Sequence, residues 1–136
     1  MIFLSAIIFT SSCTGDDENV QKSVIRDILQ QIQSSFIQRD LEKIMSFYHP
    51  DFFHKGNNIH SQSFIWQDRI NRFVELDIEF IDIEIRNDYA MAIIKITFTG
   101  EHQSLPTYID HETEGDLSYF FHDHRDWRII GNGMSE

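Results

Sequence analysis

The clearest pattern along the chain is helical. Between residues 24 and 36, apolar side chains recur every three or four positions, and charged or amide side chains fill most of the positions between them. The apolar positions are Val24, Ile25, Ile28, Leu29, Ile32 and Phe36. This spacing predicts an amphipathic helix that packs on a core, preceded by a polar tether over residues 13–19.

A second, shorter helix and a short strand are expected next. Asp40 is a residue type that caps helix N-termini, so we predict a helix that starts there and ends before Pro50. Phe52-Phe53-His54 then predicts a short strand that ends at Gly56.

A third helix is expected to start at Ser61 or Ser63 and to run through Phe64, Ile65, Arg69 and Ile70. Trp66 does not fall on the apolar face predicted for this helix. We therefore expect Trp66 at the lip of a pocket or at a dimer contact.

The period of the apolar positions changes from 3.6 to 2 at about Phe73, which predicts strands. The alternating residues are Leu76, Ile78 and Phe80, followed after a one-residue slip by Ile81, Ile83 and Ile85. Such a slip predicts a bulge that bends the strand. Next come a turn at residues 86–88, a partner strand over 90–98, a polar loop over 101–115, and a hairpin of 117–121 and 127–130.

Helices followed by hairpins predict an α+β fold, in which a cone-shaped, curved antiparallel sheet wraps around about three N-terminal helices. The chain has 136 residues, which suits one domain, and we assign residues 20–136 to it. Its formal net charge of −11 argues against nucleic acid as a partner, because phosphate contacts require basic surfaces. No motif calls for a cofactor.

The first residues of the chain predict an export signal. Met1 to Phe9 is apolar but shorter than the roughly twenty residues that span a bilayer. The small residues Thr10-Ser11-Ser12 before Cys13 resemble a bacterial lipobox. We therefore expect a signal peptide over residues 1–12, lipid on Cys13, and a place in the bacterial cell envelope, where the lipid is the only membrane anchor. The alternative is a buried N-terminal strand with a core cysteine.

Three segments carry a resemblance to a known superfamily: Arg39-Asp40-Leu41, the run from Phe47 to Asp51, and Trp127-Arg128-Ile129. Together they resemble the nuclear transport factor 2-like proteins, which include ketosteroid isomerases, polyketide cyclases and scytalone dehydratase. The resemblance implies a pocket inside the cone. The residues that it implies for the pocket wall are Phe52, His54, Asp116, Ser118 and Phe120.

The same resemblance argues against steroid isomerisation. Gly56 stands where the isomerases have their general-base Asp, and Ile32 stands where they have their oxyanion Tyr. The first hypothesis is therefore a domain that binds a small apolar molecule or a peptide. The second is a dehydratase- or hydrolase-type enzyme in which His54 acts as acid–base with Asp116, beside Tyr108.

Two further patterns leave alternatives open. His122 and His124 are spaced to share one face of a strand, which would suit a metal if a third ligand came from elsewhere. The acidic residues between 75 and 84 alternate with apolar ones, which predicts the solvent face of a half-buried sheet. The third hypothesis is that this acidic face docks a basic partner. The resemblance also implies a homodimer through the sheet, because cone-fold domains often dimerise in this way.

Overall fold

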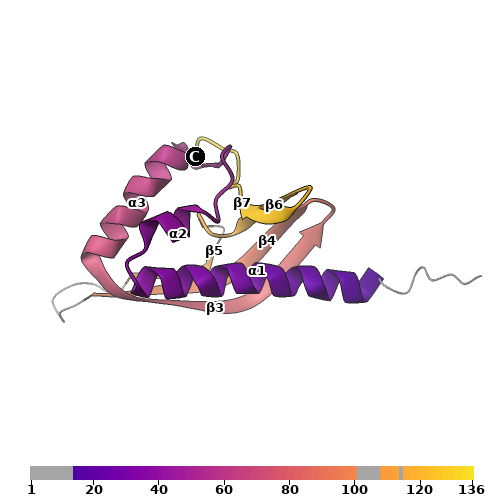
Figure 1. Cartoon of the computed structure of the whole chain (residues 1–136), viewed down its shortest axis with the longest axis horizontal. Coiled ribbons are helices and arrows are strands. Elements are labelled where there is room, and N and C mark those ends of the chain that lie inside the picture. Colours follow the sequence, from indigo (N-terminus) through magenta and orange to yellow (C-terminus); the bar gives the residue numbers. More distant parts are fainter. Residues whose placement is uncertain (1–13, 101–107, 114) are drawn as a thin grey trace, which may run out of the picture.

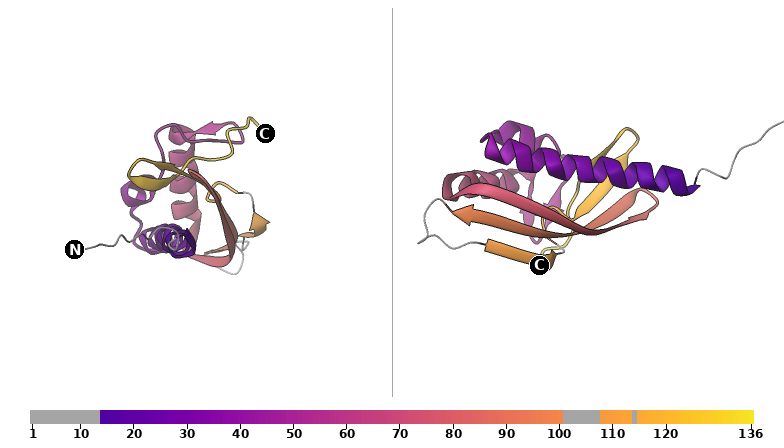
Figure 2. Two further views of the ribbon diagram at one scale, coloured as in Figure 1. Left: turned by 90° about the vertical axis from the view of Figure 1, so that its right-hand side faces the viewer. Right: turned by 90° about the horizontal axis from the view of Figure 1, so that it is seen from below.

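The computed structural model of the chain describes residues 14–100, 108–113 and 115–136. Within these residues, three helices lie on one side of a curved antiparallel sheet (Figures 1 and 2). The elements are α1 (Thr14–Ile37), α2 (Leu41–Met45), β1 (Phe53–His54), β2 (Asn57–Asn58), α3 (Ile59–Arg72), β3 (Phe73–Arg86), β4 (Tyr89–Gly100), β5 (Tyr108–Thr113), β6 (Tyr119–Asp123) and β7 (Asp126–Ile129). The predicted signal peptide and Cys13 lie outside the described residues.

Helix α1 begins earlier than the sequence pattern predicts. The prediction of a tether over residues 13–19 is wrong for residues 14–19, which form the first turns of α1. Asp17 accepts a hydrogen bond from Gln21 at 2.9 Å, and Glu18 pairs with Lys22 at 3.3 Å. Such pairs one turn apart, with acidic residues near the helix N-terminus, stabilise a helix that has no apolar face to bury there.

The buried face of α1 is narrower than predicted. Its buried apolar residues are Ile25, Ile28, Leu29, Ile32 and Phe36. Val24, which we expected on this face, is 43% exposed. Val24 lies at the margin of the buried face of α1, so the prediction is wrong for this residue.

The caps of the next two helices differ in how well the sequence predicts them. Asp40 caps α2 as predicted, and its side chain accepts a hydrogen bond from the Lys43 backbone at 3.0 Å. Helix α3 is capped by Asn58, which accepts from the Ser61 backbone at 2.9 Å, and not by Ser61 or Ser63.

The earlier start of α3 changes the face that the helix buries. Trp66 is fully buried, so the expected place at a pocket lip or dimer contact is wrong. Phe64, on the predicted apolar face, is 65% exposed. The predicted apolar face runs through Phe64, Ile65 and Ile70, whereas the helix that starts after Asn58 turns Gln62 and Trp66 toward the core.

The long hairpin of β3 and β4 follows the sequence pattern closely. The register shifts between Phe80 and Asp82, and Ile81 is half-exposed at this bulge, as the slip in the pattern predicts. The turn residue Asn87 has a φ of 58°. On β4 the buried residues are Ala90, Ala92, Ile94, Ile96 and Phe98, as predicted.

The polar segment after β4 contains a strand. Residues 108–113, predicted as part of a loop, form β5 and pair with β4. The sheet therefore runs in the order β3-β4-β6-β7, with β5 also on β4. The pattern missed β5 because its segment, Tyr-Ile-Asp-His-Glu-Thr, lacks apolar alternation.

The C-terminal segment completes the sheet and positions β1. The Ile129 backbone donates to the Phe47 carbonyl at 2.9 Å, and the Phe53 backbone donates to the Ile130 carbonyl at 3.0 Å. Gly131, with a φ of 79°, passes so close to the Phe53 carbonyl that a Cβ would collide with it. Residues near position 50 are therefore held by residues near position 130.

Aromatic rings fill the space between the helices and the sheet. Phe36, Trp66 and Phe98 lie with ring centroids 5.5 to 6.1 Å apart, and Phe73 lies 5.3 Å from Phe98. Such tilted and edge-on contacts are favoured geometries for buried rings. Among the described helices, none is long and apolar enough to cross a membrane.

Candidate functional site

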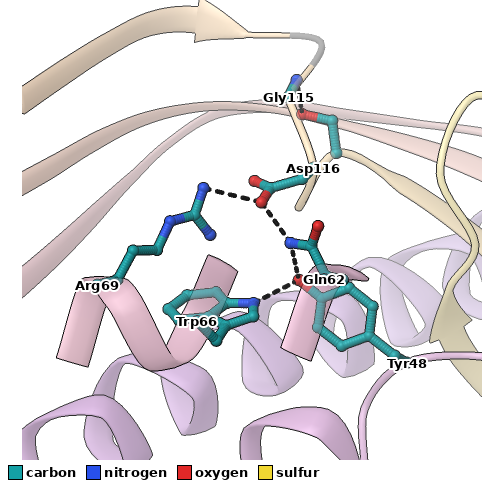
Figure 3. Close-up of polar contacts among 7 residues, drawn as sticks. Tyr48, Gln62, Trp66, Arg69, Gly115 and Asp116 are labelled. Atoms are coloured by element: carbon teal, nitrogen blue, oxygen red, sulfur yellow. Dashed lines mark hydrogen bonds and ion pairs between the residues drawn. The ribbon is translucent and has the colours of Figure 1, made fainter. Parts of the chain in front are cut away.

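A polar cluster lies within this aromatic core. It consists of Tyr48, Gln62, Trp66, Arg69 and Asp116 (Figure 3). The Tyr48 hydroxyl accepts hydrogen bonds from Trp66 Nε1 at 2.7 Å and from Gln62 Nε2 at 3.2 Å. Gln62 Nε2 also donates to Asp116 Oδ2 at 2.5 Å. Three of the five residues come from α3 at spacings of four and three, so they share one face of that helix.

Arg69 forms the charged end of the polar cluster. Its Nη2 lies 2.8 Å from Asp116 Oδ2, and the two side chains are 19% and 14% exposed. The guanidinium carbon lies 4.6 Å from the Trp66 ring centroid and 5.1 Å from that of Phe98. Arg69 Nη1 is buried and has no hydrogen-bond partner among the described residues. A buried donor without an acceptor costs about 1–3 kcal/mol.

Tyr48 is a neutral member of the cluster. Burial raises the pKa of its phenol far above the ordinary value, and the negative charge of Asp116 acts in the same direction. The hydroxyl therefore keeps its proton at any physiological pH.

A tight turn before β6 places Asp116 at the cluster. The Gly115 backbone donates to Ser118 Oγ at 3.1 Å, and the Ser118 backbone donates to the Gly115 carbonyl at 3.1 Å. Ser118 is completely buried, and its hydroxyl therefore serves the turn. The predicted wall residue Ser118 thus acts by holding Asp116 in place.

His54 is buried on β1, as the alternation predicts, and is 4% exposed. Its Nδ1 accepts a hydrogen bond from the Asn132 backbone at 3.1 Å, so the neutral imidazole carries its proton on Nε2. Its ring lies 6.0 Å from that of Tyr119. The Asp116 carboxylate is occupied by Arg69 and Gln62, and His54 is linked to it only by charge.

The other predicted wall residues are core residues. Phe52 is 2% exposed and packs edge-on against the Tyr48 ring at 5.0 Å. Phe120 is fully buried in the core and also lines a cavity together with Ala90 and Met91 of β4. Of the five predicted wall residues, the polar cluster therefore contains only Asp116. Tyr108 belongs to β5, and its side chain lies outside the described part of the structure.

The two isomerase positions are structural here. Ile32 is fully buried in the core. Gly56 sits in the turn between β1 and β2 with a φ of 82°, and its backbone donates to the Met134 carbonyl at 3.0 Å.

The predicted pairing of His122 and His124 on one strand face is wrong. His122 lies on β6 with its ring 5.1 Å from that of Trp127, whereas His124 lies in the following turn with a φ of 60°. The left-handed backbone at His124 ends the alternation on which the prediction depends. The described residues contain no group of three or more His, Cys, Asp or Glu side chains that could hold a metal ion.

His54 predicts a pH dependence of stability. Burial lowers the pKa of the imidazole, and the nearby Asp116 charge partly opposes this shift. The unfolded chain, with a pKa of about 6.5 at this residue, then binds a proton more readily than the folded one, so stability falls as the pH drops below that value.

We expect His54→Asn, whose Oδ1 can still accept from the Asn132 backbone, to flatten this slope in urea titrations between about pH 7.5 and 5. His60→Asn, at an exposed position on α3, is the matched control and should leave the slope unchanged. An identical slope in the wild type and His54→Asn would show that other groups cause the dependence.

Sequence reasoning missed Gln62 and Arg69. Their spacing around Trp66, at i, i+4 and i+7, was the available signal. It becomes informative only when Asn58 is recognised as the cap, because the cap sets which face of α3 is buried.

Comparisons with known proteins give the fold and no activity. No protein-family model matches the chain, and no curated protein matches it. Bd1075 from Bdellovibrio bacteriovorus is 15% identical with a TM-score of 0.61, and the match covers 89% of this chain but only 41% of that protein.

Two further solved structures match over most of both chains. A nuclear transport factor 2-like protein of unknown function from Shewanella oneidensis is 14% identical with a TM-score of 0.62, covering 81% of this chain and 94% of that one. A nuclear transport factor 2-like protein of unknown function from Pseudomonas putida is 11% identical with a TM-score of 0.63, covering 84% of each chain. The chain therefore has the cone fold of these proteins.

Proposed function

We propose that this domain binds a small, largely apolar molecule through a single hydrogen bond to Arg69 inside the cone. The observation that carries the proposal is Arg69 Nη1, a buried donor with no acceptor in the part of the chain that the structure describes, in a cluster whose other members are paired. The surroundings are aromatic, with Trp66 and Phe98 beside the guanidinium. An apolar site with a few polar groups that fix orientation is typical of small-molecule binding.

The charges of the cluster favour a neutral ligand. Asp116 already balances the charge of Arg69 at 2.8 Å, so a carboxylate ligand would add an uncompensated buried charge. The net charge of −11 also repels anions. Because aromatic rings lie beside the guanidinium, an acceptor has to approach in the plane of the group. A ketone, amide or ester carbonyl on an apolar body meets both requirements.

Arg69→Lys tests this proposal because lysine keeps the positive charge beside Asp116 but has no second planar nitrogen. The probes are 2-decanone, decanoic acid and decane, with binding measured by calorimetry on the full chain. We expect wild type to bind the ketone best and Arg69→Lys to weaken this binding about tenfold or more, since a hydrogen bond from a charged donor contributes about 1.5–3 kcal/mol.

Arg72→Lys is the matched control, on the same helix but in an exposed pair with Asp68, and should bind like the wild type. If the ketone binds no better than decane, or if Arg69→Lys binds it as well as the wild type, Arg69 is not the ligand donor and the proposal fails. Circular dichroism of both variants separates lost binding from lost folding.

The groups around His54 do not have the arrangement that acid–base catalysis needs. Acid–base catalysis by His54 needs a carboxylate partner or substrate-facing groups on both sides of the reacting atom. Asp116 is occupied by Arg69 and Gln62, and His54 Nδ1 is occupied by the Asn132 backbone. Neither arrangement favours the dehydratase- or hydrolase-type alternative.

We also propose that the domain is presented at the bacterial cell envelope by lipid on Cys13. The support is the sequence alone: an apolar run, small residues, then Cys13 and the acidic start of α1. Expression in a bacterial host followed by mass spectrometry tests it. A Cys13→Ser variant that remains uncleaved and leaves the membrane fraction is the expected result, and equal membrane association of both forms contradicts it.

A further inference from the structure

The sheet has a second face that none of the three described helices covers. On β3 its side chains are acidic. Their partners on β4 are polar at Thr99, Thr97 and Lys95, with Lys95 opposite Glu79, and become apolar only at Ile93 and Met91, toward the β3–β4 turn. The acidic residues, all exposed, are Glu75, Asp77, Glu79, Asp82 and Glu84. We call these five residues the acidic row. None of them has an ion-pair partner among the described residues.

An apolar cavity of about 320 Å³ opens beside the end of the acidic row. Its lining includes Tyr89, Met91 and Tyr119, with Glu84 and Arg86 from β3. In the sheet register, Met91 lies opposite both Glu84 and Tyr119, which places a carboxylate directly beside the apolar lining. Tyr89 is 58% exposed although it is a large aromatic residue. An exposed apolar patch bordered by charge marks an interaction surface.

We propose that this surface docks a basic peptide segment of another protein, with one large apolar side chain of that segment in the cavity. Alternate residues of a strand repeat about every 6.6 Å, so an extended segment with Lys or Arg at alternate positions matches the spacing of the acidic row on either side of the bulge between Phe80 and Asp82. The five carboxylates, which have no ion-pair partner in the described part of the chain, supply the complementary charge. This surface is separate from the polar cluster, so the inference does not depend on the proposed ligand.

Charge also distinguishes this partner from a second copy of the chain. Two copies that met through this face would bring two acidic rows together, and each copy carries a formal charge of −11. Like charges at close range oppose such pairing. A basic partner avoids that repulsion, because its positive charges attract the acidic row.

The test uses the full chain and a short synthetic peptide that alternates Lys with apolar residues and has a central Phe, with binding followed by fluorescence anisotropy. We expect binding that weakens about tenfold or more between about 20 and 300 mM NaCl, because salt screens exposed charges. A peptide with Ser in place of the central Phe should bind several-fold more weakly, since it leaves the cavity empty.

Two triple variants with the same change in net charge locate the site. Glu79→Gln/Asp82→Asn/Glu84→Gln neutralises three members of the acidic row, and we expect about a tenfold loss of affinity at low salt. Asp27→Asn/Glu42→Gln/Asp68→Asn neutralises one exposed carboxylate on each helix and should bind within about twofold of the wild type.

Equal losses in the two variants would mean attraction to net charge alone and would overturn the proposal. Equal binding of the Phe and Ser peptides would overturn the role of the cavity. Sedimentation of the chain without peptide measures its oligomeric state. A dimer that dissociates in Met91→Lys would assign this face to a second copy of the chain and would overturn the basic partner.

Discussion

Asp116→Ala is expected to lower the free energy of unfolding by about 3 kcal/mol or more. Asp116 is the only counter-charge of Arg69 among the described contacts, at 2.8 Å, and both side chains are mostly buried. Removing the carboxylate leaves a buried guanidinium whose Nη1 already has no acceptor among the residues that the structure describes. The same change removes the acceptor of Gln62 Nε2. Urea unfolding followed by circular dichroism measures the loss.

A double variant separates the charge from the packing. Asp116→Ala/Arg69→Met removes both charges and should recover much of the lost stability, because an apolar replacement of a buried pair is often nearly neutral. Asp126→Ala is the matched control, since Asp126 and Arg128 form an exposed pair at 4.0 Å, and it should change stability by at most about 0.5 kcal/mol. A similar loss in Asp116→Ala and Asp126→Ala would show that Asp116 is not structurally required.

Trp66→Ala is expected to cost about 3–5 kcal/mol of unfolding free energy. Trp66 is fully buried, and it contacts the rings of Phe36 and Phe98 at centroid distances of 6.1 Å. The truncation leaves a large cavity and removes the 2.7 Å hydrogen bond to the Tyr48 hydroxyl. Trp66→Phe keeps most of the volume, so it should cost less than Trp66→Ala. The same urea unfolding experiment reports both values.

Phe64→Ala, two residues earlier on α3, is the matched control. Phe64 is 65% exposed, so its truncation should cost less than about 1 kcal/mol. The pair of variants also tests the face that α3 buries. A larger loss from Phe64→Ala than from Trp66→Ala would mean that the helix is turned the other way and that the polar cluster does not exist as described.

The sequence predicts an element of the fold where a single local pattern, such as alternation or the type of a capping residue, determines it. The bulge near Ile81 follows from the slip of the alternation, and the cap at Asp40 follows from its residue type. The α3 face was predicted wrongly because Asn58, Ser61 and Ser63 are all acceptable caps, and the choice among them is decided by packing. Strand β5 has no apolar alternation, so only its pairing with β4 identifies it.

The candidate site could be predicted only in part. The alternation along residues 52–56 places Phe52, His54 and Gly56 on one face, and of these Phe52 and His54 are buried, whereas Gly56 is exposed. The polar cluster joins Gln62 to Asp116, which lie 54 residues apart in the chain. No local pattern encodes such a pair, because each member is an ordinary polar residue in its own segment. The unpaired Nη1 of Arg69 is likewise a property of the packed structure alone.

The pairing of residues 47–53 with residues 129–133 has a consequence for biosynthesis. A ribosome makes this chain from the N-terminus, so the early segment waits until about 80 later residues have been added before its partners exist. Contacts between such distant parts of a chain slow folding. Until the last strand is made, β1 has no partner on that side and the growing chain exposes unpaired backbone. We therefore expect this domain to fold after its synthesis is complete and to depend, while it is being made, on factors that keep nascent chains from aggregating.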